Sequence, residues 1–201
     1  MKTSHPVRCR CGAFEAVVSY PERGTRAVCY CLDCQAFAHF LGLPKGMLDN
    51  AGGTDIVAVR PRHVEFLRGV GNLTSMSLSA SGTLRWYTSC CRTPVGNTPR
   101  NHRHAHVGLI HTCLEASGVS MDDALGPVRM RVNVQSAKAK PAKSSPVGFA
   151  AAVLRYLASV TWSGLSGTYR TNPFFIEATG SPKVEPRVLS LTERDALFNV
   201  V

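Results

Sequence analysis

The spacing of the cysteines constrains this chain more than any other feature of its sequence. The 201 residues include eight cysteines, and all except Cys113 stand in clusters. The clusters are a pair, a triplet and a second pair: Cys9 and Cys11, then Cys29, Cys31 and Cys34, then Cys90 and Cys91. Cysteines that only fill a hydrophobic core do not gather at CxC and CxxC spacing, so we expect these clusters to bind metal. Cys113 has apolar neighbours and is expected to be an inert core thiol.

The expected compartment favours metal binding over disulfides. The opening "MKTSHPVRCRCGAFEAVV" lacks the basic and apolar regions of a signal peptide, and no apolar run reaches the roughly 18 residues that a membrane span needs. We therefore predict a cytoplasmic protein with no membrane contact. Disulfides are rare in a reducing cytoplasm, so we do not expect a disulfide between the adjacent Cys90 and Cys91.

The basic charge of the chain is spread along its length. Lysine and arginine number 23 against 13 acidic residues, which gives a formal net charge of +10. The only dense basic run, "AKAKPAK", lies in a Pro- and Ser-rich stretch that is typical of a linker. A dispersed basic surface more often keeps a protein soluble than binds nucleic acid, so we do not expect a nucleic-acid partner.

Short alternating segments dominate the first half and predict a mainly β, α+β fold. "FEAVVSY" and "RAVCYC" predict two strands, and four further runs between residues 54 and 88 predict an antiparallel sheet with one solvated face. "LDCQAFAHFLG" predicts one or two helical turns that end at Gly42 and Pro44. We expect residues 5–112 to form one β-rich domain.

Residues 113–201 are predicted to form an extension that contains helices. Ser120 is a candidate N-cap of a short helix, and "PVRMRVNVQ" alternates as a strand does. A linker over 136–146 precedes a helix over 147–162, whose broad apolar face favours docking on this molecule or a homodimer contact. Ser190 and Glu193 predict a capping box for a last helix. The extension could cover the rim of a site, pair two subunits or add to the sheet.

The clusters divide naturally into one closed and one open metal site. A zinc ion takes four ligands, and thiolates one or two residues apart on a tight turn can converge on it. Gly12 would permit such a turn after Cys9 and Cys11, which together with Cys90 and Cys91 could supply four thiolates. The triplet offers only three ligands, and the fourth position would be free for water or a substrate thiol, as in a catalytic zinc site.

The motifs "CRCG", "CYCLDCQ" and "CCRTP" resemble those of the glutathione-dependent formaldehyde-activating enzymes, the CENP-V/GFA family. The resemblance covers residues 5–112. It implies an Mss4-like β-tent fold and a structural zinc held by the first and last pairs. It also implies a second zinc on Cys29, Cys31 and Cys34, which would engage the thiol of glutathione and its formaldehyde adduct. The implied function is that of a zinc-dependent carbon–sulfur lyase or thiol-adduct enzyme, with these three cysteines at the catalytic ion.

Two positions depart from the family pattern. The penultimate cysteine of that pattern falls at Thr88, whereas this chain has Cys90 directly beside Cys91. Adjacent side chains on an extended strand point to opposite faces, so Cys90 joins the same ion only if the backbone turns there. Otherwise the fourth ligand could be His5 or a histidine of "NHRHAH", or the site could be incomplete. The second departure is Tyr30, which stands where the family usually has histidine.

Other polar residues near the clusters allow more than one interpretation. Arg85 and Arg92 flank the last pair and could bind a glutathione carboxylate, but solvated arginines at a sheet edge would give the same pattern. The histidines of "NHRHAH" could form a third metal site or an exposed loop: His102, His104 and His106. The alternative function is a noncatalytic zinc-stabilised module that binds a protein or nucleic acid, in which both clusters only hold the fold.

Overall fold

The computed structural model describes residues 3–114 and 120–201. The strands are β1 (Ser4–Arg8), β2 (Glu15–Ser19), β3 (Thr25–Cys29), β4 (Thr54–Val59), β5 (Val64–Arg68), β6 (Leu73–Ser77), β7 (Leu84–Thr88), β8 (Pro94–Thr98), β9 (Val107–Ile110), β10 (Met130–Val132) and β11 (Arg187–Val188). The α-helices are α1 (Leu32–Phe40), α2 (Pro44–Met47), α3 (Met121–Leu125), α4 (Pro146–Leu165) and α5 (Leu191–Phe198). Short 3-10 helices are η1 (Pro21–Arg23), η2 (Pro61–His63), η3 (Val70–Asn72), η4 (His111–Cys113), η6 (Val134–Ser136) and η7 (Thr168–Arg170).

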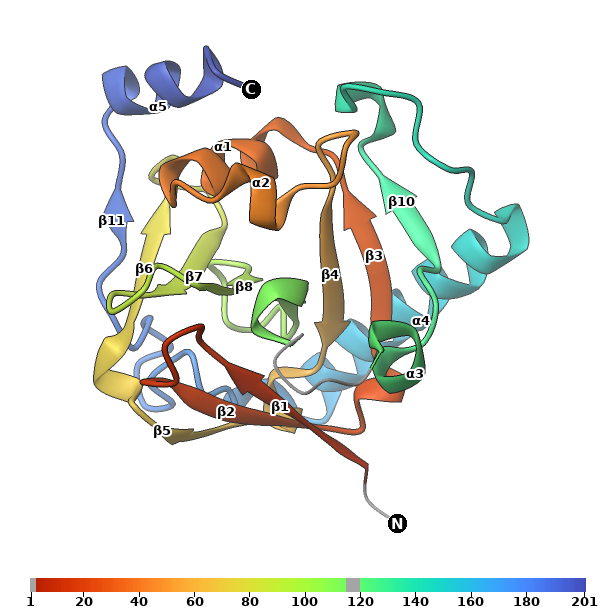
Figure 1. Cartoon of the computed structure of the whole chain (residues 1–201). Coiled ribbons are helices and arrows are strands. Elements are labelled where there is room, and N and C mark those ends of the chain that lie inside the picture. The colour runs from red at the N-terminus through yellow and green to blue at the C-terminus, as the bar shows by residue number, and fades with distance from the viewer. Residues whose placement is uncertain (1–2, 115–119) are drawn as a thin grey trace.

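The strands form two sheets, which Figure 1 shows from one side. Within the described residues, the smaller sheet has three antiparallel strands in the order β1-β2-β5, and the larger has eight in the order β10-β3-β4-β9-β8-β7-β6-β11. Both edge strands of the larger sheet come from the C-terminal extension: β10 lies parallel to β3 and β11 lies parallel to β6. The extension therefore adds to the same sheet as residues 5–112, and the whole is a mixed α+β, sheet-rich fold.

The strands between residues 54 and 88 do not form the single sheet that their pattern predicts. β4, β6 and β7 lie in the larger sheet, whereas β5 pairs with β2 in the smaller one. In the larger sheet, β3 has all five of its residues buried. The larger sheet is covered on both faces, because side chains of β1 and β2 share one core cluster with β7 and β9, and α1 and α2 share another with β6 and β9.

The core between the two sheets includes aromatic residues from both halves of the chain. Phe174, from the extension, is fully buried, and its ring centroid lies 5.1 Å from that of Trp86 and 5.0 Å from that of Phe66. Edge-to-face and tilted contacts at these distances stabilise an aromatic cluster beyond the burial of its area. Phe174 thus joins the extension to both sheets.

A buried hydrogen bond of the Trp86 indole contributes to the stability of this core. Trp86 Nε1 donates a hydrogen bond of 2.9 Å to Thr98 Oγ1, and both residues are almost completely buried. Thr98→Val keeps the shape but leaves the indole N–H without its acceptor, so we expect the free energy of unfolding to fall by about 1–3 kcal/mol. Urea unfolding measures this loss. Thr98→Ser, which keeps the hydroxyl, is the matched control, and equal losses in the two variants would contradict the explanation.

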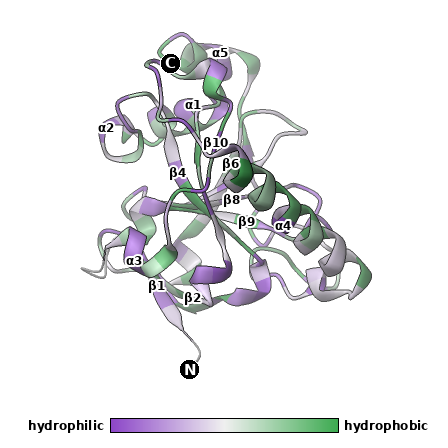
Figure 2. Ribbon diagram, turned by 90° about the vertical axis from the view of Figure 1, so that its right-hand side faces the viewer, coloured by the Kyte–Doolittle hydropathy of each residue, from purple (hydrophilic) through white to green (hydrophobic). Residues whose placement is uncertain are grey.

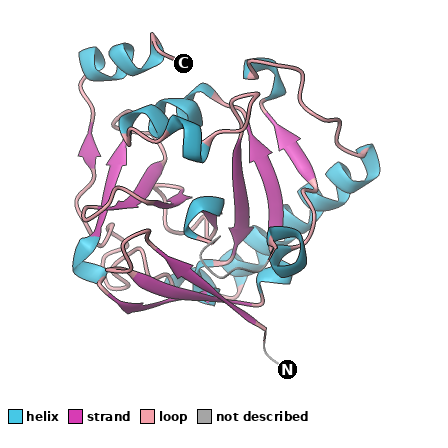
Figure 3. Cartoon of the chain, in the orientation of Figure 1, coloured by secondary structure: helices cyan, strands magenta, loops and turns pink. Residues whose placement is uncertain are grey.

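The helices lie outside the sheets (Figure 3) and begin and end largely where the sequence predicts. α1 ends in a Schellman motif, in which Gly42, with φ of 70°, donates to His39 O and Leu43 donates to Ala38 O. Ser120 caps α3 by accepting from Asp123 N, and Ser190 with Glu193 forms the predicted capping box of α5. These agreements follow from local signals that act within one turn.

α4 confirms the predicted helix and extends it by one residue before and three after. Only Ala152 and Ser163 of α4 are buried, and Figure 2 shows the helix across one side of the molecule with hydrophobic residues along it. Its exposed apolar side chains include Val147, Leu154 and Leu165. The predicted homodimer contact stays a prediction. Among the described helices, none has the length and hydropathy to cross a bilayer.

Candidate metal centres

Four cysteines from two distant turns meet in one cluster, which we call the four-cysteine site. Cys9 and Cys11 lie in the turn between β1 and β2, where Gly12 adopts φ of 74° and donates to Cys9 O. Cys90 and Cys91 lie in the turn between β7 and β8. Their ligand atoms all lie within 4.8 Å of one another. The predicted grouping of Cys9, Cys11, Cys90 and Cys91 is therefore confirmed.

The backbone between β7 and β8 turns as Cys90 requires. Arg92 adopts a left-handed φ of 56°, its N–H donates to Thr88 O at 2.8 Å, and Thr88 N–H donates to Thr93 O at 3.0 Å. This turn removes the strand geometry that would send adjacent side chains to opposite faces. Cys90 Sγ lies 3.4 Å from Cys11 Sγ and 3.9 Å from Cys9 Sγ.

The histidines considered as substitutes for Cys90 lie elsewhere. His5 is buried, and its Nε2 lies 2.7 Å from Leu114 O. His102 packs on Tyr169 and Phe175, while His106 packs on Tyr156. In the part of the chain that the structure describes, no group of potential metal ligands includes a histidine. The histidines of "NHRHAH" lie on a loop, and they do not form a third metal site there.

Hydrogen bonds hold individual sulfurs of the four-cysteine site. Phe14 N donates to Cys9 Sγ at 3.2 Å, and Cys91 Sγ lies 3.1 Å from Thr93 Oγ1 and 3.5 Å from Thr88 Oγ1. Burial opposes the charge of Cys91, but the hydroxyls of Thr88 and Thr93 favour the thiolate and lower the pKa of Cys91 to about 5. Thr88, where the family pattern has its penultimate cysteine, thus contacts the site through its hydroxyl.

Crowding has the opposite effect on Cys11. A backbone hydrogen bond from Ala13 favours its thiolate, but contacts with the sulfurs of Cys90, Cys9 and Cys91 outweigh that bond and raise the pKa of Cys11 to about 12. Four thiols this close cannot all ionise without a positive charge between them. The site could therefore hold a cation.

Cys29, Cys31 and Cys34 form the second cluster, which we call the triplet. Cys29 ends β3, Cys31 is the N-cap residue of α1, and Cys34 lies in the first turn of that helix. Cys29 Sγ and Cys31 Sγ are 3.4 Å apart, and all three sulfurs lie within 4.8 Å of one another. Cys29 and Cys34 are buried and Cys31 is half-buried. Among the described residues, no fourth cysteine, histidine or carboxylate belongs to this group.

Two side chains from distant parts of the sequence approach the triplet. Arg85 is 3% exposed, and its Nη1 lies 3.8 Å from Cys34 Sγ while its Nη2 lies 3.5 Å from Asp33 Oδ2. Its guanidinium also lies over the ring of Phe37, 5.5 Å from the centroid. Asn133 donates from Nδ2 to Cys29 Sγ at 3.4 Å. N–H groups aimed at sulfurs favour the thiolate form.

The three sulfurs share charge unequally. Hydrogen bonds from Cys31 and Cys34, with a smaller one from Asn133, lower the pKa of Cys29 to about 2. The same contact with Cys29 raises the pKa of Cys31 and of Cys34. One thiolate is thus favoured at the triplet, and further ionisation needs a cation to offset the repulsion.

Arg85, Arg92 and Tyr30, which the sequence analysis singled out, differ in their burial and in their contacts. Arg85 is buried beside the triplet, whereas Arg92 donates to Phe40 O at the end of α1 and lies over the Phe40 ring. Tyr30 is buried and donates from its hydroxyl to Asp49 Oδ2 at 3.1 Å. The sequence reasoning missed Asn133, because its contact joins residues 104 positions apart. The strand pattern of "PVRMRVNVQ" included this residue, which directly follows β10 in the structure, but it carried no sign of its partner.

One family model matches almost the whole chain. Its description is a family of unknown function, DUF6151, and it matches residues 1–185. The chain belongs to this family. The match includes the β-rich region and most of the extension of this DUF6151 member. No curated protein matches the chain significantly. A crystal structure of a Rhodobacter sphaeroides protein is similar to it with a TM-score of 0.41 and 22% identity, covering 65% of this chain and 100% of that one.

Both clusters have the chemistry and spacing of metal sites. Four sulfurs bound to one tetrahedral ion at about 2.3 Å lie roughly 3.8 Å apart. In the four-cysteine site, Cys90 Sγ lies 3.4 Å from Cys11 Sγ and 3.9 Å from Cys91 Sγ, and all four sulfurs lie within 4.8 Å of one another. The two measured separations are too long for disulfides. The eight cysteines all lie in the described part of the chain, and none forms a disulfide there. The cysteine groups of this DUF6151 member could therefore hold metal ions.

Proposed function

We propose that this chain is a zinc-dependent enzyme that acts on adducts of a small thiol such as glutathione, as a carbon–sulfur lyase or a related enzyme. In this proposal the four-cysteine site holds a structural zinc and the triplet holds a second zinc. Thiolate ligands at these spacings suit zinc, which takes tetrahedral sulfur sites. The two sheets would then correspond to the Mss4-like β-tent of the formaldehyde-activating enzymes, whose motifs the chain resembles.

The observation that carries the proposal is the difference between the two clusters. The four-cysteine site offers a complete set of four sulfurs, whereas the triplet offers three, and no fourth ligand from the described residues joins it. Structural zinc sites are closed, and catalytic ones keep one position for substrate or water. Cys31, the half-buried member of the triplet, marks the side from which a thiol would approach.

Zinc at the triplet would supply the positive charge that lowers the pKa of a bound thiol and favours its thiolate. Three thiolates reduce this effect, because they place a net negative charge around a divalent ion. Arg85 offsets that charge with its guanidinium 3.8 Å from Cys34 Sγ, and Asn133 withdraws density from Cys29 through its N–H. The two residues thus adjust the electron density on the sulfurs.

The reaction in this proposal is the reversible addition of a thiol to an aldehyde. The S–H bond of the thiol breaks, a bond forms between sulfur and the carbonyl carbon, and the proton ends on the former carbonyl oxygen. The lyase direction reverses each change, so atoms and electrons balance without an oxidant. Arg85 and Arg92 were candidates to bind a glutathione carboxylate. Of the two, Arg92 is the one at an exposed contact, beside Phe40.

The alternative is a noncatalytic module in which both ions only stabilise the fold and a partner binds elsewhere. The exposed apolar side chains of α4, Leu154 and Leu165 among them, favour this alternative. The two functions differ in what the triplet does. If the triplet is only structural, loss of its zinc ion should unfold the protein, and glutathione should not bind at the triplet.

Cys31→Ala separates the two functions. Cys31 makes no side-chain capping bond to α1, so the helix should keep its N-terminus. We expect the zinc content to fall from two ions per chain to one, the circular dichroism spectrum to stay unchanged, and glutathione binding by calorimetry to be lost. Cys113→Ala, which removes a thiol outside both clusters, is the control and should keep both ions and glutathione binding. Unfolding of Cys31→Ala, or its unchanged binding of glutathione, would overturn the enzyme proposal.

A further inference from the structure

We propose that a small molecule carrying a phosphate group binds in a basic cavity between α4 and one end of the larger sheet. The cavity lies at the start of β3, whereas the triplet begins at the end of that strand. Four residue steps of about 3.3 Å separate Thr25 from Cys29, which places the two sites roughly 13 Å apart along the strand. No cysteine lines the cavity, so this inference does not depend on the proposed function.

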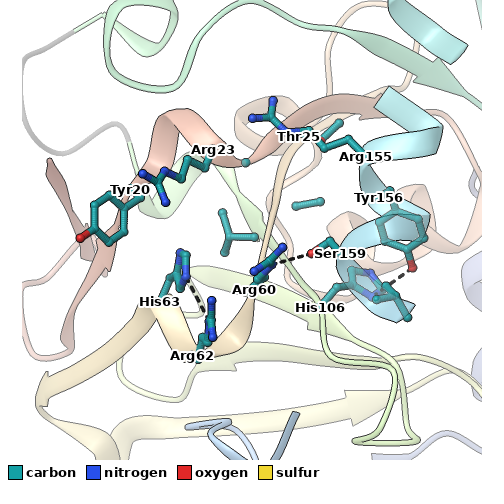
Figure 4. A pocket seen from close by; sticks show the side chains of 14 residues that line it. Tyr20, Arg23, Thr25, Arg60, Arg62, His63, His106, Arg155, Tyr156 and Ser159 are labelled. Atoms are coloured by element: carbon teal, nitrogen blue, oxygen red, sulfur yellow. Dashed lines mark hydrogen bonds between the residues drawn. The ribbon is translucent and has the colours of Figure 1, made fainter. Parts of the chain in front are cut away.

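Four segments that are distant in sequence build the cavity, and one of them, the loop before β9, supplies His106. η1 and the start of β3 supply Arg23 and Thr25, the segment from the end of β4 into η2 supplies Arg60 and His63, and α4 supplies Arg155 and Ser159. The enclosed volume is about 190 Å³. Figure 4 shows the basic side chains around this space. Such a concave arrangement differs from the dispersed basic surface that the composition suggested.

Positively charged side chains predominate in the lining of the cavity. Four arginines and two histidines line it, and no aspartate or glutamate does: Arg23, Arg60, Arg62, Arg155, His63 and His106. Arg60 Nε donates to the neutral Ser159 Oγ at 2.8 Å, and Arg62 Nε donates to His63 Nε2 at 3.3 Å. Arg23 lies 4.0 Å from Glu22, a carboxylate that is not part of the cavity lining, and its guanidinium lies over the Tyr20 ring, 4.5 Å from the centroid. Within the described part of the chain, Arg60, Arg62 and Arg155 form no ion pair.

Burial and repulsion between neighbouring positive charges lower the pKa of two of these groups. Burial, followed by the charges of Arg62 and Arg23, lowers the pKa of Arg60. Burial, followed by the charges of Arg62 and Arg60, also lowers the pKa of His63. Holding these like charges close together raises the free energy of the protein that has no ligand bound. A bound anion would offset that repulsion, because its negative charge would lie between the arginines.

The shape and donors of the cavity favour a phosphate over other anions. Guanidinium groups present planar forks that bind phosphate oxygens two at a time, and arginines from three directions suit a tetrahedral dianion better than a planar carboxylate. Pockets for drug-sized ligands measure about 300–1,000 Å³. This smaller cavity therefore suits a phosphate with a short organic stem, or phosphate itself, rather than a nucleotide.

Calorimetry on the full-length protein at low salt tests the proposal, with inorganic phosphate and glycerol 3-phosphate as probes. We expect saturable binding of at least one probe with one site per chain, and the tighter of the two identifies the source of the phosphate. Arg60→Gln should weaken that binding at least about tenfold, since it removes a charge-assisted hydrogen bond to the anion. Arg155→Gln, on the exposed surface of α4, should weaken it similarly without any risk to folding.

Lys45→Gln is the matched control, because it removes one positive charge from the exposed surface of α2, which is not part of the cavity. It should leave phosphate affinity within about twofold of the original, since exposed charges at a distance are screened. Absence of saturable binding, or an equal loss in Lys45→Gln, would overturn the proposal. Binding of succinate instead of both phosphate probes would also overturn it, as would binding of duplex DNA that Arg60→Gln abolishes.

Discussion

Cys90→Ser is expected to remove one zinc ion per chain and to unfold the protein. Cys90 Sγ lies within 3.4 Å of Cys11 and 3.9 Å of Cys9, so it completes a site that joins the β1–β2 turn to the β7–β8 turn. Structural zinc contributes about 10–16 kcal/mol of apparent binding free energy in small zinc domains. That contribution is as large as the whole free energy of unfolding of an ordinary domain, about 5–15 kcal/mol, so its loss is expected to unfold the protein. Zinc content and thermal unfolding together measure the effect.

Two further variants sharpen this experiment. Ser89→Ala removes the neighbouring exposed side chain and should keep both ions and the thermal midpoint. The double variant Thr88→Cys with Cys90→Ser moves the ligand to the position that the formaldehyde-activating family uses. Thr88 Oγ1 lies 3.5 Å from Cys91 Sγ, so the new thiol should reach the ion and restore the fold. A Cys90→Ser protein that keeps two zinc ions and its stability would show that Cys90 is not a ligand.

Arg85→Met is expected to weaken zinc at the triplet about 10–100-fold and to leave the four-cysteine site loaded. The guanidinium is almost fully buried and faces Cys34 Sγ at 3.8 Å. Three thiolates with a divalent ion carry one net negative charge, and methionine would leave that buried charge without its partner. Competition with a chromophoric chelator measures the two sites separately, because only the weaker one should release its ion early.

Arg92→Met is the matched control for Arg85→Met. It removes the same type of side chain from a position that contacts Phe40 O and not the triplet sulfurs. Zinc affinity at the triplet should therefore stay unchanged. If the chelator removes zinc equally easily from both variants, the effect of Arg85 is not electrostatic support of the triplet.

Signals within a few residues predicted much of the structure correctly. The spacing of Cys29, Cys31 and Cys34 predicted one cluster, because a strand end and the first helical turn bring these sulfurs together without help from the rest of the chain. Gly42 predicted the end of α1, and Ser190 with Glu193 predicted the capping box of α5. Each of these features depends on backbone geometry over one turn.

Contacts between segments that are distant in sequence could not be predicted from the sequence. β5 has the same alternation as its neighbours, yet it pairs with β2 in the smaller sheet. Asn133 reaches Cys29 only because β10 lies beside β3. The arginines of the basic cavity are separated in sequence, and their charge looked dispersed until α4 and the strand ends brought them together.

By itself, the sequence determined which atoms were available for metal binding and how the nearest of them group, since a turn of a few residues allows few arrangements. The tertiary structure alone decided that Cys90 turns toward Cys9 and Cys11, that Arg85 is buried beside the triplet, and that four arginines surround one cavity. Such contacts depend on strand order and register, which are set by burying the shared core and not by the residues that meet.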